Sequence, residues 1–133
     1  MNLNLIVILF VLHFLCDFLF QSRWMAENKG KNVLALSLHV LIYSLVLFIG
    51  LYSYREIVGP NILSLVDQIK GDQLLWFVVI NFLLHFVTDL TTSQFTRYFW
   101  EKNDKHKFFA VIGFDQCVHQ ICLMITAKIF LGA

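Results

Sequence analysis

Charged residues are scarce in this sequence. They make up 14% of its 133 residues, whereas a soluble domain usually carries about 25%. The net charge is only +1, so the chain has no basic surface of the kind that binds nucleic acid. One proline and six glycines are too few for a linker-rich or low-complexity chain. A glycine-rich nucleotide-binding loop and a Gly-x-Ser-x-Gly nucleophile turn are both missing from the sequence.

Cysteine is also rare, and its positions do not suggest a disulfide framework. Cys16, Cys117 and Cys122 each lie inside an apolar run, and their number is odd. We interpret them as small buried hydrophobic residues rather than as metal ligands.

Long apolar runs are what the sequence has in abundance. Four segments, 3–21, 33–51, 74–94 and 108–130, each supply the roughly 20 mostly apolar residues that a membrane-spanning helix needs. The first is longer than the hydrophobic segment of a signal peptide, about 7–15 residues, so we expect it to be retained. The sequence therefore predicts an all-α integral membrane protein. We expect a single transmembrane domain over residues 1–133, built as a four-helix bundle.

Basic residues are distributed unevenly among the predicted connections. The first and third connections carry most of them: Arg23, Lys29, Lys31, Arg97, Lys102, Lys105 and Lys107. The positive-inside rule therefore predicts that these connections lie in the cytoplasm and that both termini lie outside it. In the middle connection, residues 61–70 have apolar side chains at helical spacing. This spacing predicts a short amphipathic helix on the outer surface.

The two halves of the chain share a short pattern. His13-Phe-Leu-Cys-Asp17 lies in the first predicted span, and His85-Phe-Val-Thr-Asp89 lies in the third. We interpret each half as a helical hairpin with its turn in the cytoplasm. Two such hairpins of the same orientation would be related by a pseudo-two-fold axis along the membrane normal.

Ionisable residues inside the predicted spans carry the functional prediction. An aspartate near the bilayer centre costs roughly 2.5–3.5 kcal/mol, so three of them require compensation by one another, by water or by a cation. Six of these residues form His–Asp pairs four residues apart, a spacing that shares one helix face. All lie about 9–18 Å below the cytoplasmic edge, at about 1.5 Å per residue. The full set is His13, Asp17, His39, His85, Asp89, Asp115 and His119.

This set predicts a metal site in the cytoplasmic half of the bundle. Four imidazoles and three carboxylates are enough ligands for one or two divalent ions, with Zn²⁺ the preferred candidate. Asp115 and His39 are each expected to be a ligand or the general base, and the other five are expected ligands. Gln21 and Gln116 are expected to orient the ligands. A proton-handling site and a purely structural polar layer are the alternatives.

The polar pattern resembles that of a family of small bacterial and phage membrane proteins of unknown function. The pattern is His-x-x-x-Asp-x-x-x-Gln, then a His, then His-x-x-x-Asp, then Asp-Gln-x-x-His. Here it corresponds to His13/Asp17/Gln21, His39, His85/Asp89 and Asp115-Gln116/His119. The resemblance implies four spans, a polar core and a bacterial inner membrane, but no established activity.

The two His-x-x-x-Asp helices are also similar to those of zinc-dependent phospholipase C and of membrane-bound metal-dependent hydrolases. That similarity implies a zinc ion and phosphoester hydrolysis. Our leading hypothesis is a metal-dependent hydrolase acting on a phospholipid or another phosphoester at the basic cytoplasmic face. The alternatives are a cation or proton carrier or channel, which would need a homo-oligomer, and a non-catalytic membrane assembly partner. Membrane lipid is the expected partner, and nucleic acid is not.

Overall fold

Helices account for almost all of the described chain, which comprises residues 3–58 and 70–132 of the computed structural model. No strand occurs within these residues. Five α-helices and one π-helical turn follow one another along these described residues. They are α1 (Leu3–Phe14), the π-helical turn η1 (Leu15–Leu19), α2 (Arg23–Asn28), α3 (Val33–Val58), α4 (Gly71–Glu101) and α5 (Lys105–Phe130).

Three of these helices are long and apolar enough to cross a membrane. Helices α3, α4 and α5 contain 26, 31 and 26 residues, and their most apolar windows have mean hydropathies of 2.4, 1.8 and 1.6. A spanning helix needs about 20 such residues. The all-α class is thus confirmed, but the predicted bundle of four spans is wrong, because the described chain has five helices and only three of this length.

The prediction of a first membrane span is wrong because the helix ends too early. Apolar helix continues only from Leu3 to Leu19, roughly 25 Å at about 1.5 Å per residue, and a bilayer core is about 30 Å thick. The side chain of Ser22 then accepts a hydrogen bond from the backbone N–H of Met25 and caps a new helix, α2. Hydropathy does not detect this stop, because apolar residues continue to Phe20.

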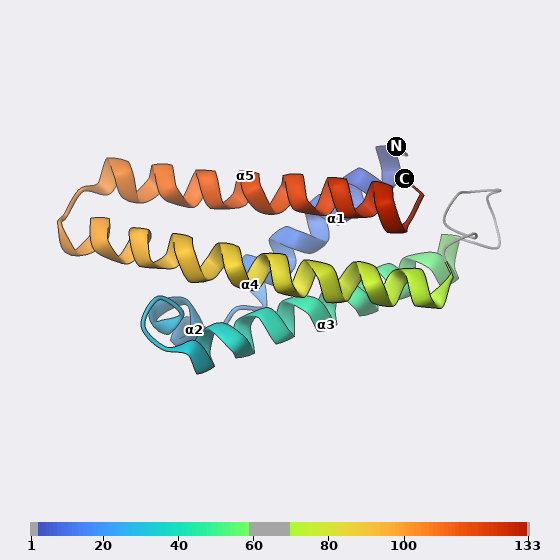
Figure 1. Cartoon of the computed structure of the whole chain (residues 1–133), viewed down its shortest axis with the longest axis horizontal. Coiled ribbons are helices and arrows are strands. Elements are labelled where there is room, and N and C mark those ends of the chain that lie inside the picture. The colour runs from blue at the N-terminus through green and yellow to red at the C-terminus, as the bar shows by residue number, and fades with distance from the viewer. Residues whose placement is uncertain (1–2, 59–69, 133) are drawn as a thin grey trace.

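The prediction of two similar hairpins is wrong for a related reason. Helices α4 and α5 are antiparallel neighbours joined by a tight turn, in which Asn103 has a φ of 54° (Figure 1). In the first half, α2 intervenes between η1 and α3, so the two halves differ in their helices. The amphipathic helix predicted over 61–70 falls almost wholly on residues 59–69, outside the described part of the chain.

Buried side chains divide the molecule along its length. Figure 1 shows the chain termini at one end and α2 with the α4–α5 turn at the other. An apolar core fills the end that holds the termini, and its members include Leu5, Leu9, Leu47, Leu51, Leu74, Phe77, Leu123 and Ala127. Buried polar residues follow this core toward the other end, in the middle of α3, α4 and α5. The fold thus contains a buried polar layer, and apolar side chains cover one side of it.

Candidate metal centre

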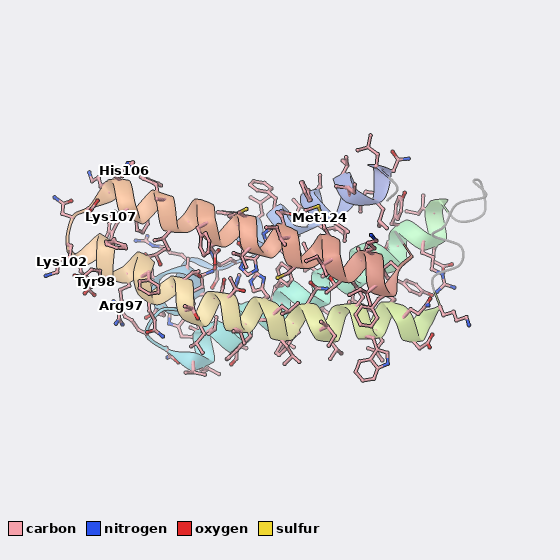
Figure 2. The ribbon with its side chains drawn as sticks, turned by 45° about the horizontal axis from the view of Figure 1, so that its top comes forward. Arg97, Tyr98, Lys102, His106, Lys107 and Met124 are labelled. Carbon is pink, nitrogen blue, oxygen red and sulfur yellow. The ribbon has the colours of Figure 1, made fainter. Side chains whose placement is uncertain are left out.

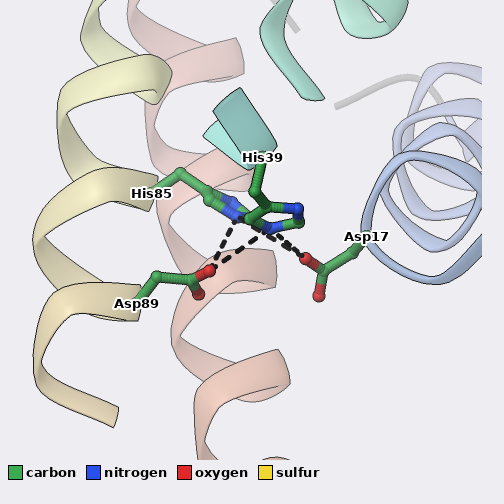
Figure 3. Close-up of side chains that lie close together, drawn as sticks. All are labelled: Asp17, His39, His85 and Asp89. Carbon is green, nitrogen blue, oxygen red and sulfur yellow. Dashed lines mark hydrogen bonds and ion pairs between the residues drawn. The ribbon is translucent and has the colours of Figure 1, made fainter. Parts of the chain in front are cut away.

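Four buried side chains from three elements converge at the centre of the polar layer. His39 comes from α3, His85 and Asp89 come from α4, and Asp17 comes from η1 (Figure 3). None is more than 3% exposed. His85 and Asp89 share a face of α4 because they are four residues apart. We call these four residues the first group.

The distances from the two imidazole nitrogens of the first group match those between neighbouring ligands of a tetrahedral ion. The two imidazole nitrogens, His39 Nε2 and His85 Nε2, lie 3.1 Å apart. His39 Nε2 lies 3.0 Å from Asp17 Oδ1 and 3.2 Å from Asp89 Oδ2. The corresponding distances from His85 Nε2 are 3.5 and 3.6 Å. Bonds of about 2.0–2.1 Å to a tetrahedral ion place neighbouring ligand atoms about 3.3 Å apart, so this group can hold a metal ion.

A second group of three side chains adjoins the first and shares Asp89 with it. Its other members are Asp115 and His119, both on α5 and both buried. His119 Nε2 lies 3.1 Å from Asp89 Oδ1 and 3.4 Å from Asp115 Oδ1. Asp89 therefore directs one carboxylate oxygen to each group.

Gln116 ties the two groups together. Its amide nitrogen donates hydrogen bonds to Asp17 Oδ2 at 2.6 Å and to Asp115 Oδ2 at 3.2 Å. Its amide oxygen lies 3.0 Å from His13 Nε2, which must therefore be the protonated ring nitrogen. His13 Nδ1 then accepts a hydrogen bond from the hydroxyl of Tyr43, at 3.1 Å. Gln116 thus fixes carboxylates of both groups, and both nitrogens of His13 are already engaged.

Lys29 provides a positive charge beside the centre. Its ammonium lies 2.8 Å from Asp89 Oδ2, and its side chain is 18% exposed. Burial alone would lower the pKa of Lys29, but attraction by Asp89 and Asp17 and the hydrogen bond to Asp89 raise that pKa above its ordinary value. With neutral imidazoles, three ionised aspartates and one lysine leave two uncompensated negative charges. A single divalent cation would neutralise them.

The turn between α2 and α3 holds Lys29 in place. Arg97 on α4 donates a hydrogen bond of 3.1 Å to the carbonyl oxygen of Gly30. The backbone at Gly30 passes so close to α4 that an added Cβ would lie 2.8 Å from the carbonyl oxygen of Ser93. Glycine is therefore required for this close approach, and the approach positions the neighbouring lysine.

Two hollows lie beside the two groups. The smaller, the metal cavity, has a volume of about 190 Å³ and is lined by residues that include Asp17, Asp89, Asp115 and Lys29. The larger, the vestibule, has a volume of about 540 Å³ and is lined by residues that include Lys31, Arg97 and Trp100. They share several lining residues, Ala26, Lys29, Ser93, Thr96 and Phe108. The metal cavity therefore continues toward the end of the molecule that carries the basic residues.

The structure brings together most of the residues singled out in the sequence. Six of the seven ionisable residues belong to the two groups, and His13 lies beside them on Tyr43 and Gln116. Gln21 lines the metal cavity, and its amide oxygen is buried without a hydrogen-bond partner in the described chain. Sequence reasoning missed Tyr43 and the partly buried ion pair of Lys29 with Asp89. The spacing of Tyr43 four residues after His39 is a signal that could have placed it on the same face.

Comparison with known proteins identifies a family but no activity. The profile of a family described as "Protein of unknown function (DUF3307)" matches residues 5–132. The chain belongs to this family. No curated protein and no solved structure matches the chain. The match agrees with the expected membership of an uncharacterised family, and the function has to be argued from the site.

Proposed function

We propose that this protein is a membrane-embedded hydrolase that uses a buried divalent cation, with Zn²⁺ the preferred ion, to cleave a phosphoester. The observation that carries the proposal is the spacing of the first group, whose imidazole nitrogens and carboxylate oxygens lie 3.0–3.6 Å apart. Borderline nitrogen and oxygen ligands in such an arrangement suit Zn²⁺. With the imidazoles neutral, as metal ligands must be, a divalent cation would also balance the two negative charges that remain after Lys29 is counted.

Access from one end supports an enzyme over a carrier or channel. A conduit needs a path to both ends of the bundle. The metal cavity shares lining residues with the vestibule and so continues toward the basic end. Figure 2 shows Arg97, Lys102 and Lys107 at that end of the molecule. On the opposite side, buried Tyr43 and the apolar core occupy the space between the helices.

The unsatisfied polar atoms support a ligand site over a structural polar layer. A layer that only locks helices together is expected to pair its buried polar atoms internally. Asp17 Oδ1 is buried and is not assigned a hydrogen bond in the described chain, although His39 Nε2 lies 3.0 Å from it. A cation among the four donor atoms would satisfy this oxygen.

The proposal places the basic end of α4 and α5 in the cytoplasm of a bacterial inner membrane, following the positive-inside rule. Helices α3, α4 and α5 would cross the bilayer, and the polar layer would lie within it. Arg97 and Lys31 beside the vestibule would then face anionic lipid headgroups or a phosphorylated substrate.

The cavity residues have definable tasks in hydrolysis. A divalent ion at such a site polarises a phosphoryl oxygen and lowers the pKa of a water ligand. Lys29 faces the cavity, where its ammonium can offset negative charge that develops on the phosphoryl group. In the overall reaction the water oxygen forms a bond to phosphorus, the ester P–O bond breaks, and the leaving alcohol takes one water proton.

Metal content and hydrolysis measured on the same preparation test the proposal. The full chain, purified in detergent, is expected to contain stoichiometric zinc by mass spectrometry of the metal. It is also expected to release phosphate from vesicles containing phosphatidic acid or from p-nitrophenyl phosphate. Asp89→Asn is expected to lose both properties. His106→Ala is the matched control, because His106 is exposed at the start of α5 (Figure 2), and it is expected to keep both.

Two results would overturn the proposal. The absence of any stoichiometric divalent ion would remove the metal centre. A bound ion without hydrolysis, accompanied by cation flux into proteoliposomes that Asp89→Asn abolishes, would replace the hydrolase with a carrier.

A further inference from the structure

We propose that the second group, made of Asp89, Asp115 and His119, is a second divalent-cation position, joined to the first through the carboxylate of Asp89. The inference rests on the proposed function, because the two positions share a ligand. It makes the centre dinuclear and assigns Asp115 as a metal ligand.

The distances in the second group repeat those of the first. His119 Nε2 lies 3.1 Å from Asp89 Oδ1 and 3.4 Å from Asp115 Oδ1, close to the spacing of about 3.3 Å expected around a tetrahedral ion. The first group uses the other oxygen of Asp89, which lies 3.2 Å from His39 Nε2. A carboxylate that serves two ions with separate oxygens suits two-metal sites, in which the ions are about 3.5–4 Å apart.

The two positions differ in the number of protein ligands. The first group offers four donor atoms and the second offers three. Four protein ligands are typical of closed zinc sites, whereas three protein ligands leave a coordination position for water or substrate. The second position would therefore be the more open of the two, whereas the first would admit water or a phosphoryl oxygen by expanding to five ligands.

The metal cavity lies where a fourth ligand of the second position would enter. Two of the three donors, Asp89 and Asp115, line this cavity. Ser93 also lines it, is only 8% exposed, and has a hydroxyl without a hydrogen-bond partner in the described chain. A buried hydroxyl without a partner points to a water or a ligand oxygen in the cavity.

Hydrogen bonds hold Asp115 in the orientation that a ligand needs. Thr92 on α4 donates to Asp115 Oδ1 at 2.5 Å, and Gln116 donates to Asp115 Oδ2 at 3.2 Å. Partners of this kind orient metal-binding carboxylates. They also leave lone pairs on Oδ1 available, because a carboxylate oxygen can accept more than one interaction.

The net charge of a dinuclear centre indicates which kind of substrate it would bind. Three aspartates and Lys29 leave two negative charges, and two divalent ions would convert this to two positive charges. A phosphate monoester carries up to two negative charges, so it would restore neutrality in the metal cavity. The dinuclear centre therefore favours a terminal phosphate group over an uncharged ester.

Metal titration of the full chain tests the second position. The purified protein is stripped with a chelator and reloaded with Zn²⁺ or Mn²⁺. The wild-type chain is expected to bind two equivalents, and Asp115→Asn and His119→Ala are each expected to bind one. The Mn²⁺ form of the wild-type chain is expected to show the electron paramagnetic resonance spectrum of two exchange-coupled ions. His106→Ala is the control and is expected to match the wild-type chain in both measurements.

The outcomes separate this inference from the proposed function. One equivalent in the wild-type chain, unchanged in Asp115→Asn and lost in His39→Ala, would overturn the second position and leave the first intact. Two equivalents with an uncoupled manganese spectrum would overturn the Asp89 bridge. No bound metal in the wild-type chain would overturn both proposals. The spectrum of the wild-type chain keeps the test decisive if a variant does not fold.

Discussion

Asp89 is the residue on which the largest number of interactions in the centre depend. Its two oxygens contact His39, His119 and Lys29 at 2.8–3.2 Å, and the side chain is 1% exposed. A carboxylate so deeply buried is costly unless cations or hydrogen-bond donors surround it. A substitution of Asp89 is therefore expected to change both metal binding and stability, and a second substitution at Lys29 can separate the two effects.

Asp89→Asn is expected to abolish metal binding and to lower stability by about 2–3 kcal/mol, because it leaves the partly buried Lys29 ammonium without its partner. The double variant Asp89→Asn/Lys29→Met removes that unpaired charge. It is expected to regain most of the thermal stability in detergent but none of the metal. Recovery of metal binding in the double variant would contradict the assignment of Asp89 as a ligand.

Gln116 acts on the centre through the carboxylates that it orients. Gln116→Ala removes the hydrogen bonds to Asp17 and Asp115, and we expect zinc affinity to fall by about 10–100-fold. Competition with a chromogenic chelator measures this change. Gln94→Ala on the exposed face of α4 is the matched control. Equal affinities of the two variants would show that Gln116 does not orient the ligands.

At the scale of elements, the π-helical turn η1 determines what the first helix contributes. The backbone N–H of Phe20 bonds to the carbonyl oxygen of Leu15, a bond that spans five residues instead of four. Asp17 lies within this wider turn and enters the first group. His13, one turn earlier in α1, contacts Tyr43 and Gln116, and Gln116 also bonds to Asp17.

The turn between α2 and α3 is the second element on which the centre depends. Gly30→Ala would place a Cβ 2.8 Å from the carbonyl oxygen of Ser93, so the turn must move away from α4 and carry Lys29 with it. We expect a lower melting temperature and weaker metal binding. Gly113→Ala on α5 has nothing within 4 Å of the added Cβ and is the matched control, expected to be neutral or slightly stabilising. Unchanged melting of Gly30→Ala would show that the close approach is dispensable.

For the whole molecule, the sequence predicted those helix boundaries that depend only on hydropathy and helical spacing. The predicted starts at 33, 74 and 108 lie within three residues of the starts of α3, α4 and α5, at Val33, Gly71 and Lys105. The last span ends at the predicted residue, Phe130, but α3 and α4 extend past their predicted ends. Helix α4 continues through polar residues to Glu101, because a helix does not stop where its apolar stretch stops. The breaks at η1 and Ser22 depend on local hydrogen bonds that hydropathy does not report.

The clustering of the ligands was predictable, because the His and Asp residues of α4 and α5 have the same spacing along their helices and lie at similar depth. His85 and Asp89, and likewise Asp115 and His119, share helix faces that the packing of these helices turns inward. The partly buried position of Lys29 was not predictable in the same way. Lys29 was interpreted as a determinant of membrane topology, because nothing in its immediate sequence shows that Gly30 brings the turn against α4.

Membrane orientation is a prediction for the whole molecule. Cysteines introduced at Lys102 and at Glu56, both exposed positions near opposite ends of the helices, are expected to react with an impermeant maleimide from opposite sides of the membrane. In a cysteine-free background, Lys102→Cys should react only in inverted vesicles, and Glu56→Cys only in intact spheroplasts. Labelling of both positions from one side would contradict the proposed insertion.

Anomalous diffraction at the zinc absorption edge tests the central claim most directly, because it locates the ion among the side chains. We predict a peak about 2.0–2.2 Å from His39 Nε2, His85 Nε2, Asp17 Oδ1 and Asp89 Oδ2. Crystals of the zinc-loaded protein that show no peak there, or a peak only on the basic residues beside the vestibule, would contradict the account.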